Sequence, residues 1–148
     1  MSKMVQAFLT GLFFTFILDF FLFLGIYQNY IKVHEIDVYY NILFADHQNI
    51  FIFCFFTLFI GYIVIYTGKK ISIFIMSILF LGAFSTLIPS VGSFVAEKML
   101  MQKGITLYTK KFSYHGDLYY NGRKTITFYD YELKKVIILD KNKIQSGV

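Results

Sequence analysis

The chain has 148 residues, of which 57% are hydrophobic and 16% are charged, and its formal net charge is +5. So little charge, together with long apolar stretches, argues against a soluble globular domain and favours the membrane class. The single cysteine, Cys54, excludes an intramolecular disulfide and a multi-thiol metal centre.

Three apolar segments predict membrane-spanning helices over residues 5–27, 50–66 and 71–96. The first and third exceed the ~20 residues that a helix needs to cross a bilayer, and the second is at the short limit. Tyr27 and Tyr66 close the first two segments, and aromatic residues are enriched at the membrane surface. We therefore expect residues 1–96 to form a three-helix transmembrane domain.

The loop over residues 32–49 has a helical pattern of its own. One face at i, i+3, i+4 and i+7 spacing would hold Val33, Ile36, Tyr40, Leu43, Phe44 and His47. This pattern favours either a short amphipathic helix in the membrane interface or a partly helical extramembrane loop. Asp46 and Asn49 are expected to cap the helix that follows.

The second and third segments are separated only by residues 67–70, so they should form a tight antiparallel hairpin. The first and third segments would then run parallel. Pro89, near the far end of the third segment, predicts a kink or the point where the chain leaves the hydrocarbon.

Residues 97–148 differ in composition and carry ten Lys or Arg against five Asp or Glu. Alternating or apolar stretches at 105–108, 125–128 and 136–139 predict strands, and Asn121-Gly122 is a strong hairpin signal. Further turns are expected at 115–117 and 132–135. The predicted fold class is membrane α+β: three transmembrane helices followed by a small antiparallel meander of about four strands. So small a module should lean on the membrane, a partner or another copy.

Asp19 is the only charge in the first segment. A carboxylate at the centre of a bilayer costs roughly 2.5–3.5 kcal/mol on insertion scales. Three roles are therefore open: a structural carboxyl bonded to Thr15 or to Ser85 and Thr86, a contact with a helix of another subunit, or a carrier of protons or cations.

Small and weakly polar residues predict that the first and third segments pack together. Gly11, Thr15 and Asp19 repeat along the first segment, and the third carries Gly82, Ser85, Thr86, Pro89 and Ser93. Small residues let membrane helices approach closely.

Other chemistry is weakly supported. His34, Glu35 and His47 are the best candidate metal ligands, but their spacing matches no known ligand pattern, so we predict no metal and no cofactor. The tail mixes Lys with Tyr, but anionic headgroups or edge protection explain this more simply than nucleic acid. No nucleophile or phosphate-binding motif is present, which favours a protein that is not an enzyme.

The sequence thus favours a non-enzymatic accessory or assembly protein of a larger inner-membrane complex of the motor, secretion or respiratory type. Its expected partners are other membrane subunits and the lipid bilayer, and a homo-oligomer is open. The alternatives are an ion- or proton-conducting subunit that uses Asp19, and a membrane enzyme with a metal site in loop 32–49. Phe, Ile, Tyr and Lys usage indicates an AT-rich bacterial genome. Lys3, Lys69 and Lys70 favour a cytoplasmic N-terminus and a periplasmic tail.

Overall fold

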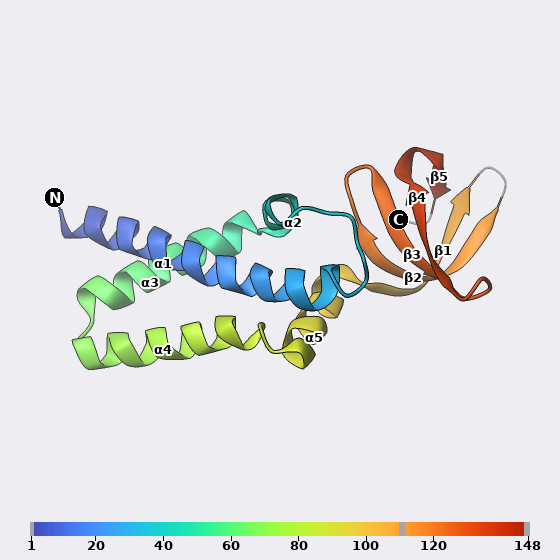
Figure 1. Cartoon of the computed structure of the whole chain (residues 1–148). Coiled ribbons are helices and arrows are strands. Elements are labelled where there is room, and N and C mark those ends of the chain that lie inside the picture. The colour runs from blue at the N-terminus through green and yellow to red at the C-terminus, as the bar shows by residue number, and fades with distance from the viewer. Residues whose placement is uncertain (1, 110–111, 147–148) are drawn as a thin grey trace.

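The computed structural model describes residues 2–109 and 112–146. A helical module is followed by a small antiparallel sheet at one end of an elongated molecule (Figure 1). This order of helices and strands confirms the α+β part of the predicted fold.

The first helix, α1 (Lys3–Ile26), continues into a π-helical turn, Tyr27–Ile31. Together they form the one described helix that is long and apolar enough to cross a membrane by itself. Two further spans are counted if each of two bent helix pairs is taken as one. The side chain of Ser2 caps α1 by accepting a hydrogen bond from the backbone N–H of Val5.

The first bent pair is α2 (Tyr40–His47) and α3 (Ile50–Tyr66), which meet at 85°. Helix α3 has the bounds expected from the sequence, and Asn49 caps it through the N–H groups of Phe51 and Ile52. Asp46 has a different role from the one expected, because its carboxylate accepts hydrogen bonds from Arg123. In loop 32–49 only the second half is helical.

The second bent pair is α4 (Lys69–Ser85) and α5 (Pro89–Leu100), which meet at 86°. The segment 71–96 is therefore two helices and not one. Pro89 is the first residue of α5. Proline has no backbone N–H and its ring clashes with the preceding turn, so it cannot continue α4. Its fixed φ nevertheless suits the first turn of a new helix.

Helix α1 packs most closely on α3, through small residues on both helices. A Cβ atom on Gly11 would overlap the carbonyl oxygen of Thr57, and one on Gly61 would overlap that of Ala7. This close approach of backbones is typical of small-xxx-small contacts between apolar helices. A small-residue contact was expected between the first and third apolar segments. At Gly11 it is instead formed between the first and second segments, which are α1 and α3.

The sheet contains β1 (Gln102–Thr109), β2 (Ser113–Asn121), β3 (Thr125–Asp130), β4 (Lys135–Asp140) and the short β5 (Ile144–Ser146). Its order is β4-β3-β2-β1-β5, with every pair antiparallel. The hairpin at Asn121-Gly122 is confirmed. The prediction of a turn at 115–117 is wrong, because these residues lie within β2. Gly116 instead lets the backbone of Tyr129 on the neighbouring strand approach closely.

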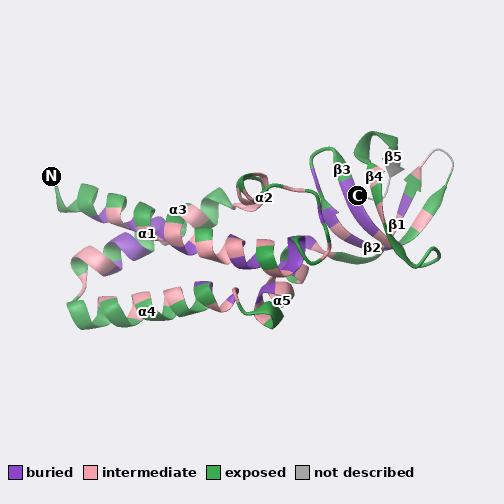
Figure 2. Ribbon diagram, in the orientation of Figure 1, coloured by how far each residue is buried: buried purple, intermediate pink, exposed green. Residues whose placement is uncertain are grey.

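The sheet has its own core of four fully buried side chains, Leu107, Leu118, Ile126 and Phe128. Tyr120 turns the other way and belongs to a second cluster with Tyr30, Leu43 and Leu100 of the helical module. Buried residues continue from the sheet into the adjoining ends of the helices (Figure 2). The small β module therefore leans on its own helices.

Candidate functional site

Asp19 lies on α1 beside a glutamine that directly follows α2. Its Oδ2 atom accepts a hydrogen bond of 2.9 Å from Nε2 of Gln48, which follows the last residue of α2. The three hydroxyl side chains proposed as partners from the sequence, Thr15, Ser85 and Thr86, make no hydrogen bond with this carboxyl among the described residues. Gln48 lies in the loop over residues 32–49 and was not predicted as a partner of Asp19.

Asp19 opens into a cleft of about 410 Å³ between α1, α3 and α4. The lining is mostly apolar and includes Ile52 near the start of α3 and Gly82 near the end of α4. Asp19 thus lies near one end of the three-helix bundle, although it is central in its own apolar segment. The difference arises because α1 with its π-helical turn is longer than either of its neighbours.

A second polar group lines the same cleft. The hydroxyl of Thr15 is buried and has no hydrogen-bond partner among the described residues, and the same holds for Thr57 on the facing helix. A buried hydroxyl without a partner is unfavourable, but both oxygen atoms are closed off from the cleft, so they offer no hydrogen bond to a molecule that enters it.

The remaining residues of the predicted stripe divide into two groups. Ser93 donates to the carbonyl oxygen of Asn29, and Thr86 packs against Gly25, so both contact α1 or its π-helical extension. Ser85 donates within its own helix to the carbonyl of Gly82. Gly82 itself is exposed, and no described atom lies within 4 Å of where its Cβ would be, so it is not a packing residue here.

Asn29, which the sequence analysis did not select, holds the break between α4 and α5. Its Nδ2 atom donates to the carbonyl oxygens of Thr86 (2.9 Å) and Leu87 (3.2 Å). Carbonyls at the end of a helix lack intrahelical partners, and the amide supplies them. The sequence did hold a signal for this contact: an asparagine follows the first apolar segment, and a helix break at Pro89 leaves carbonyl groups for it to bind.

Two polar contacts fix the β module to the helices. The Tyr30 hydroxyl donates to the carbonyl of Tyr119 (3.0 Å), and Nε of Arg123 donates to Oδ2 of Asp46 (2.8 Å). The Arg123 guanidinium binds the carboxylate in a two-pronged manner, which is the most specific geometry for this pair. The sheet is therefore held in one orientation on α1 and α2.

The candidate metal ligands of loop 32–49 do not come together. The ring of His34 lies against Tyr30 and Tyr119, whereas that of His47 lies against Tyr120. Glu35 is in a left-handed turn with φ of 52°. Within residues 2–109 and 112–146, no three His, Cys, Asp or Glu side chains form a cluster that could hold a metal ion.

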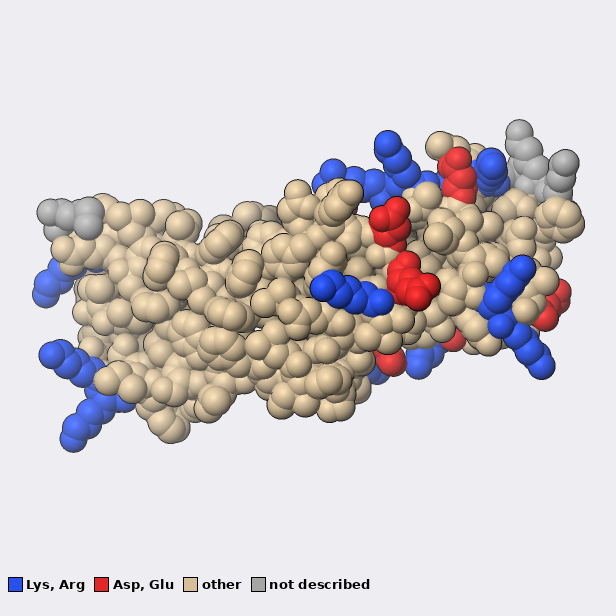
Figure 3. All heavy atoms as spheres, in the orientation of Figure 1, with Lys and Arg blue, Asp and Glu red and all other residues tan. Residues whose placement is uncertain are grey.

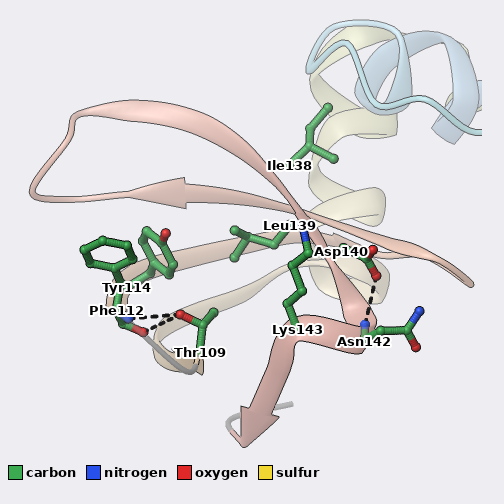
Figure 4. Close-up of a pocket in the computed structure, with 8 residues that line it drawn as sticks. All are labelled: Thr109, Phe112, Tyr114, Ile138, Leu139, Asp140, Asn142 and Lys143. Carbon is green, nitrogen blue, oxygen red and sulfur yellow. Dashed lines mark hydrogen bonds between the residues drawn. The ribbon is translucent and has the colours of Figure 1, made fainter.

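The sheet has a pocket of about 540 Å³ where Thr109 at the end of β1 and Tyr114 near the start of β2 face the connection from β4 to β5 (Figure 4). Tyr114 and Leu139 supply apolar surface, and Asp140 and Lys143 are the charged lining residues. Asp140 already accepts a hydrogen bond from the backbone of Asn142, so it caps the short 3₁₀ turn. Among the described lining residues, Thr109 bonds with Phe112 and Asp140 with Asn142, and no hydrogen bond joins the hydroxyl, the carboxylate and Lys143 into a catalytic arrangement.

The Asp46–Arg123 contact predicts an acid-sensitive junction. Hydrogen bonding by Arg123 lowers the pKa of Asp46 from its ordinary value of 3.8. Because the folded pKa is the lower one, the stabilisation is present above about pH 4 and is lost as the pH falls through the lowered pKa. The Arg123 Nε–H signal in NMR spectra should stay in its hydrogen-bonded position at pH 5 and move towards the free position below pH 3.8.

The variant Asp46→Asn should give the free position at every pH. Glu97→Gln, which removes the exposed contact with Lys103 elsewhere, should leave the signal unchanged. If the Arg123 signal changed neither in acid nor in the Asp46→Asn variant, the contact between the sheet and α2 would not depend on the Asp46–Arg123 pair.

No protein-family profile matches the chain, and no curated protein or solved structure matches it either.

Proposed function

We propose that the chain is an integral membrane protein that crosses the bilayer three times, through α1, α3 and α4. The support is apolar surface that faces outward: Phe51, Leu58, Phe74 and Leu81 are each more than 60% exposed. On the face shown in Figure 3, the helical module has a wide band without a charged side chain between its two charged ends. Large exposed apolar patches mark a surface that is normally covered, and hydrocarbon would cover this one.

The bent helices fit this arrangement. With α1, α3 and α4 along the bilayer normal, α2 and α5 would lie nearly flat at one membrane surface, because they turn by 85° and 86°. Flat helices with an apolar side are typical of the interface. They would form a layer between the bilayer and the sheet.

The charge distribution favours an orientation. The starts of α1 and α4, which carry Lys3 and the pair Lys69 and Lys70, lie at the end remote from the sheet (Figure 1). Short positively charged segments usually stay on the cytoplasmic side. The proposal therefore places this end in the cytoplasm and the β module in the periplasm of a bacterial inner membrane.

The role that we propose is that of a non-enzymatic accessory or assembly subunit of a larger membrane complex. The observation that carries it is the cleft at Asp19: Oδ2 of the carboxylate accepts from Gln48, Oδ1 has no hydrogen bond among the described residues, and the walls are apolar. A membrane helix from a partner, with one hydrogen-bond donor on an apolar face, would satisfy all three features.

Substitution of Asp19 tests the role. Asp19→Asn keeps a hydrogen-bonding side chain and should leave the protein in its complex, whereas Asp19→Leu should reduce the complex on native gels of solubilised membranes at least tenfold. A matched control, Phe13→Leu, changes an exposed side chain on the same helix and should have no effect.

A photo-crosslinker at Ile78, which lines the cleft, should trap a protein partner, while one at Ile73, which is 66% exposed and lies on the other side of α4, should trap mainly lipid. An undiminished complex in Asp19→Leu, with only lipid adducts at position 78, would refute the proposed contact. Loss of ion flux in Asp19→Asn would instead indicate a conducting subunit. Release of the protein from membranes by alkaline carbonate would refute membrane insertion itself.

A further inference from the structure

Strand β4 forms one edge of the sheet. Its six residues pair in unbroken register with β3, from Lys135 opposite Asp130 to Asp140 opposite Thr125. Each of the other three strand pairs contains a register shift. Among the described residues, no strand pairs with the other side of β4. A regular edge of this kind offers a row of backbone N–H and C=O groups to another strand.

The exposed side chains of β4 lack the usual protection of an edge strand. Natural edges carry proline, bulges or central charges, but here Val136 and Ile138 are 44% and 60% exposed. Charges stand only at the ends of this apolar pair, with Lys134 just before the strand and Asp140 at its last position, both exposed. The exposed residues at alternate positions are thus basic, apolar, apolar and acidic, with Lys134 in the left-handed turn (φ of 51°) that leads into β4.

This order is complementary to itself when reversed. In an antiparallel pair with a two-fold axis through Ile137, Val136 of each copy lies opposite Ile138 of the other. Lys134 then lies opposite Asp140, and symmetry forms this contact twice. An axis through Ile138 would set Val136 against Asp140, so the pattern selects the first register.

From the free edge and the self-complementary pattern, we propose that β4 pairs with β4 of a second copy of this chain. The two sheets would then form one continuous sheet across the two-fold axis. Cross-strand apolar and opposite-charge pairs are the units that stabilise such an edge. The backbone hydrogen bonds add to them, as in other cases of strand addition.

The two-fold axis of the proposed dimer has a direction that is compatible with membrane insertion. This argument is the one part of the inference that rests on the proposed function. Val136 and Ile138 face the loop after α1, because a pocket of about 400 Å³ is lined by both and by Val33, His34 and Glu35. Figure 4 shows Ile138 and Leu139 leaving β4 on opposite sides. An axis normal to this face runs towards the helices, so both copies would enter one bilayer in the same direction.

Charge reversal tests the pairing in the full-length protein in detergent. The wild type should sediment as a dimer, and Asp140→Lys should weaken the dimer at least tenfold by setting Lys against Lys. The double variant Lys134→Asp with Asp140→Lys should restore it. Since both variants lose the Asp140 cap of the 3₁₀ turn, recovery would report the interface and not the fold. Glu132→Lys, in the turn before β4, is the matched charge reversal and should leave the dimer intact.

Cysteine crosslinking fixes the register. In a Cys54→Ser background, a mixture of Val136→Cys and Ile138→Cys chains should form intermolecular disulfides at least tenfold faster than chains with Tyr108→Cys, an exposed site on β1. A monomeric wild type, a dimer insensitive to Asp140→Lys, or failure of the double variant to recover would each overturn the proposal. A dimer that carbonate releases from membranes would keep the pairing and refute the membrane model alone.

Discussion

Replacing Gly11 with leucine should separate α1 from α3 and destabilise the helical module by about 3 kcal/mol or more. Insertion of methylene groups into a packed contact typically costs 1–3 kcal/mol. The upper end applies because a Cβ at this position would meet the backbone carbonyl of Thr57, and a backbone atom cannot rotate away as a side chain can. The expected measurement is a lower midpoint of thermal unfolding in detergent.

Gly82→Leu is the matched control for this prediction. The residue is exposed, and no described atom lies within 4 Å of its Cβ position. Leucine is a better helix former than glycine by roughly 1 kcal/mol, so this variant should unfold at the same temperature or a higher one. Equal destabilisation by the two substitutions would show that Gly11 does not lie at a close helix contact.

Phe128→Ala should unfold the β module. The ring is fully buried among Leu107, Leu118 and Ile126, and loss of a buried phenylalanine typically costs 3–5 kcal/mol. A core of this size contributes only a few kcal/mol in total, so the loss exceeds what the module can tolerate. Amide hydrogen exchange should show lost protection in β2 and β3, while α1 and α3 keep theirs.

Phe112→Ala provides the comparison within the same module. Phe112 is 64% exposed, so its removal should change stability by no more than about 0.5 kcal/mol. Retained protection of β3 in Phe128→Ala would show that contacts with the helices, such as that of Tyr120, are sufficient to hold the strands.

Helix and strand boundaries were predicted from the sequence more accurately than the contacts between helices. The bounds of α3, the cap at Asn49 and the hairpin at Asn121-Gly122 depend on local chemistry, which a single sequence records. The turn expected at 115–117 failed because a glycine within a strand and one within a turn have the same local signal. The bend between α4 and α5 could be placed near Pro89, but its angle depends on packing against Asn29.

The candidate site was only partly predictable, for a related reason. Asp19 stands out in any reading of the sequence, because a charge within an apolar helix is rare. Its partner Gln48 comes from a loop, and no periodicity connects the two. Gly11 was rightly selected as a small residue, but the sequence did not reveal which helix faces it. Gly82 has the same chemistry, but it lines the open cleft and its Cβ would contact no neighbouring helix.

The shortness of α3 and α4 bears on where such a protein would reside. Each has 17 residues, which is about 25 Å of helix, against a typical hydrocarbon thickness of 30 Å. In the proposed arrangement, the bilayer around these two helices would thin locally, or the protein would accumulate where lipid tails are shorter. Reconstitution into vesicles of graded acyl-chain length should therefore favour the shorter chains.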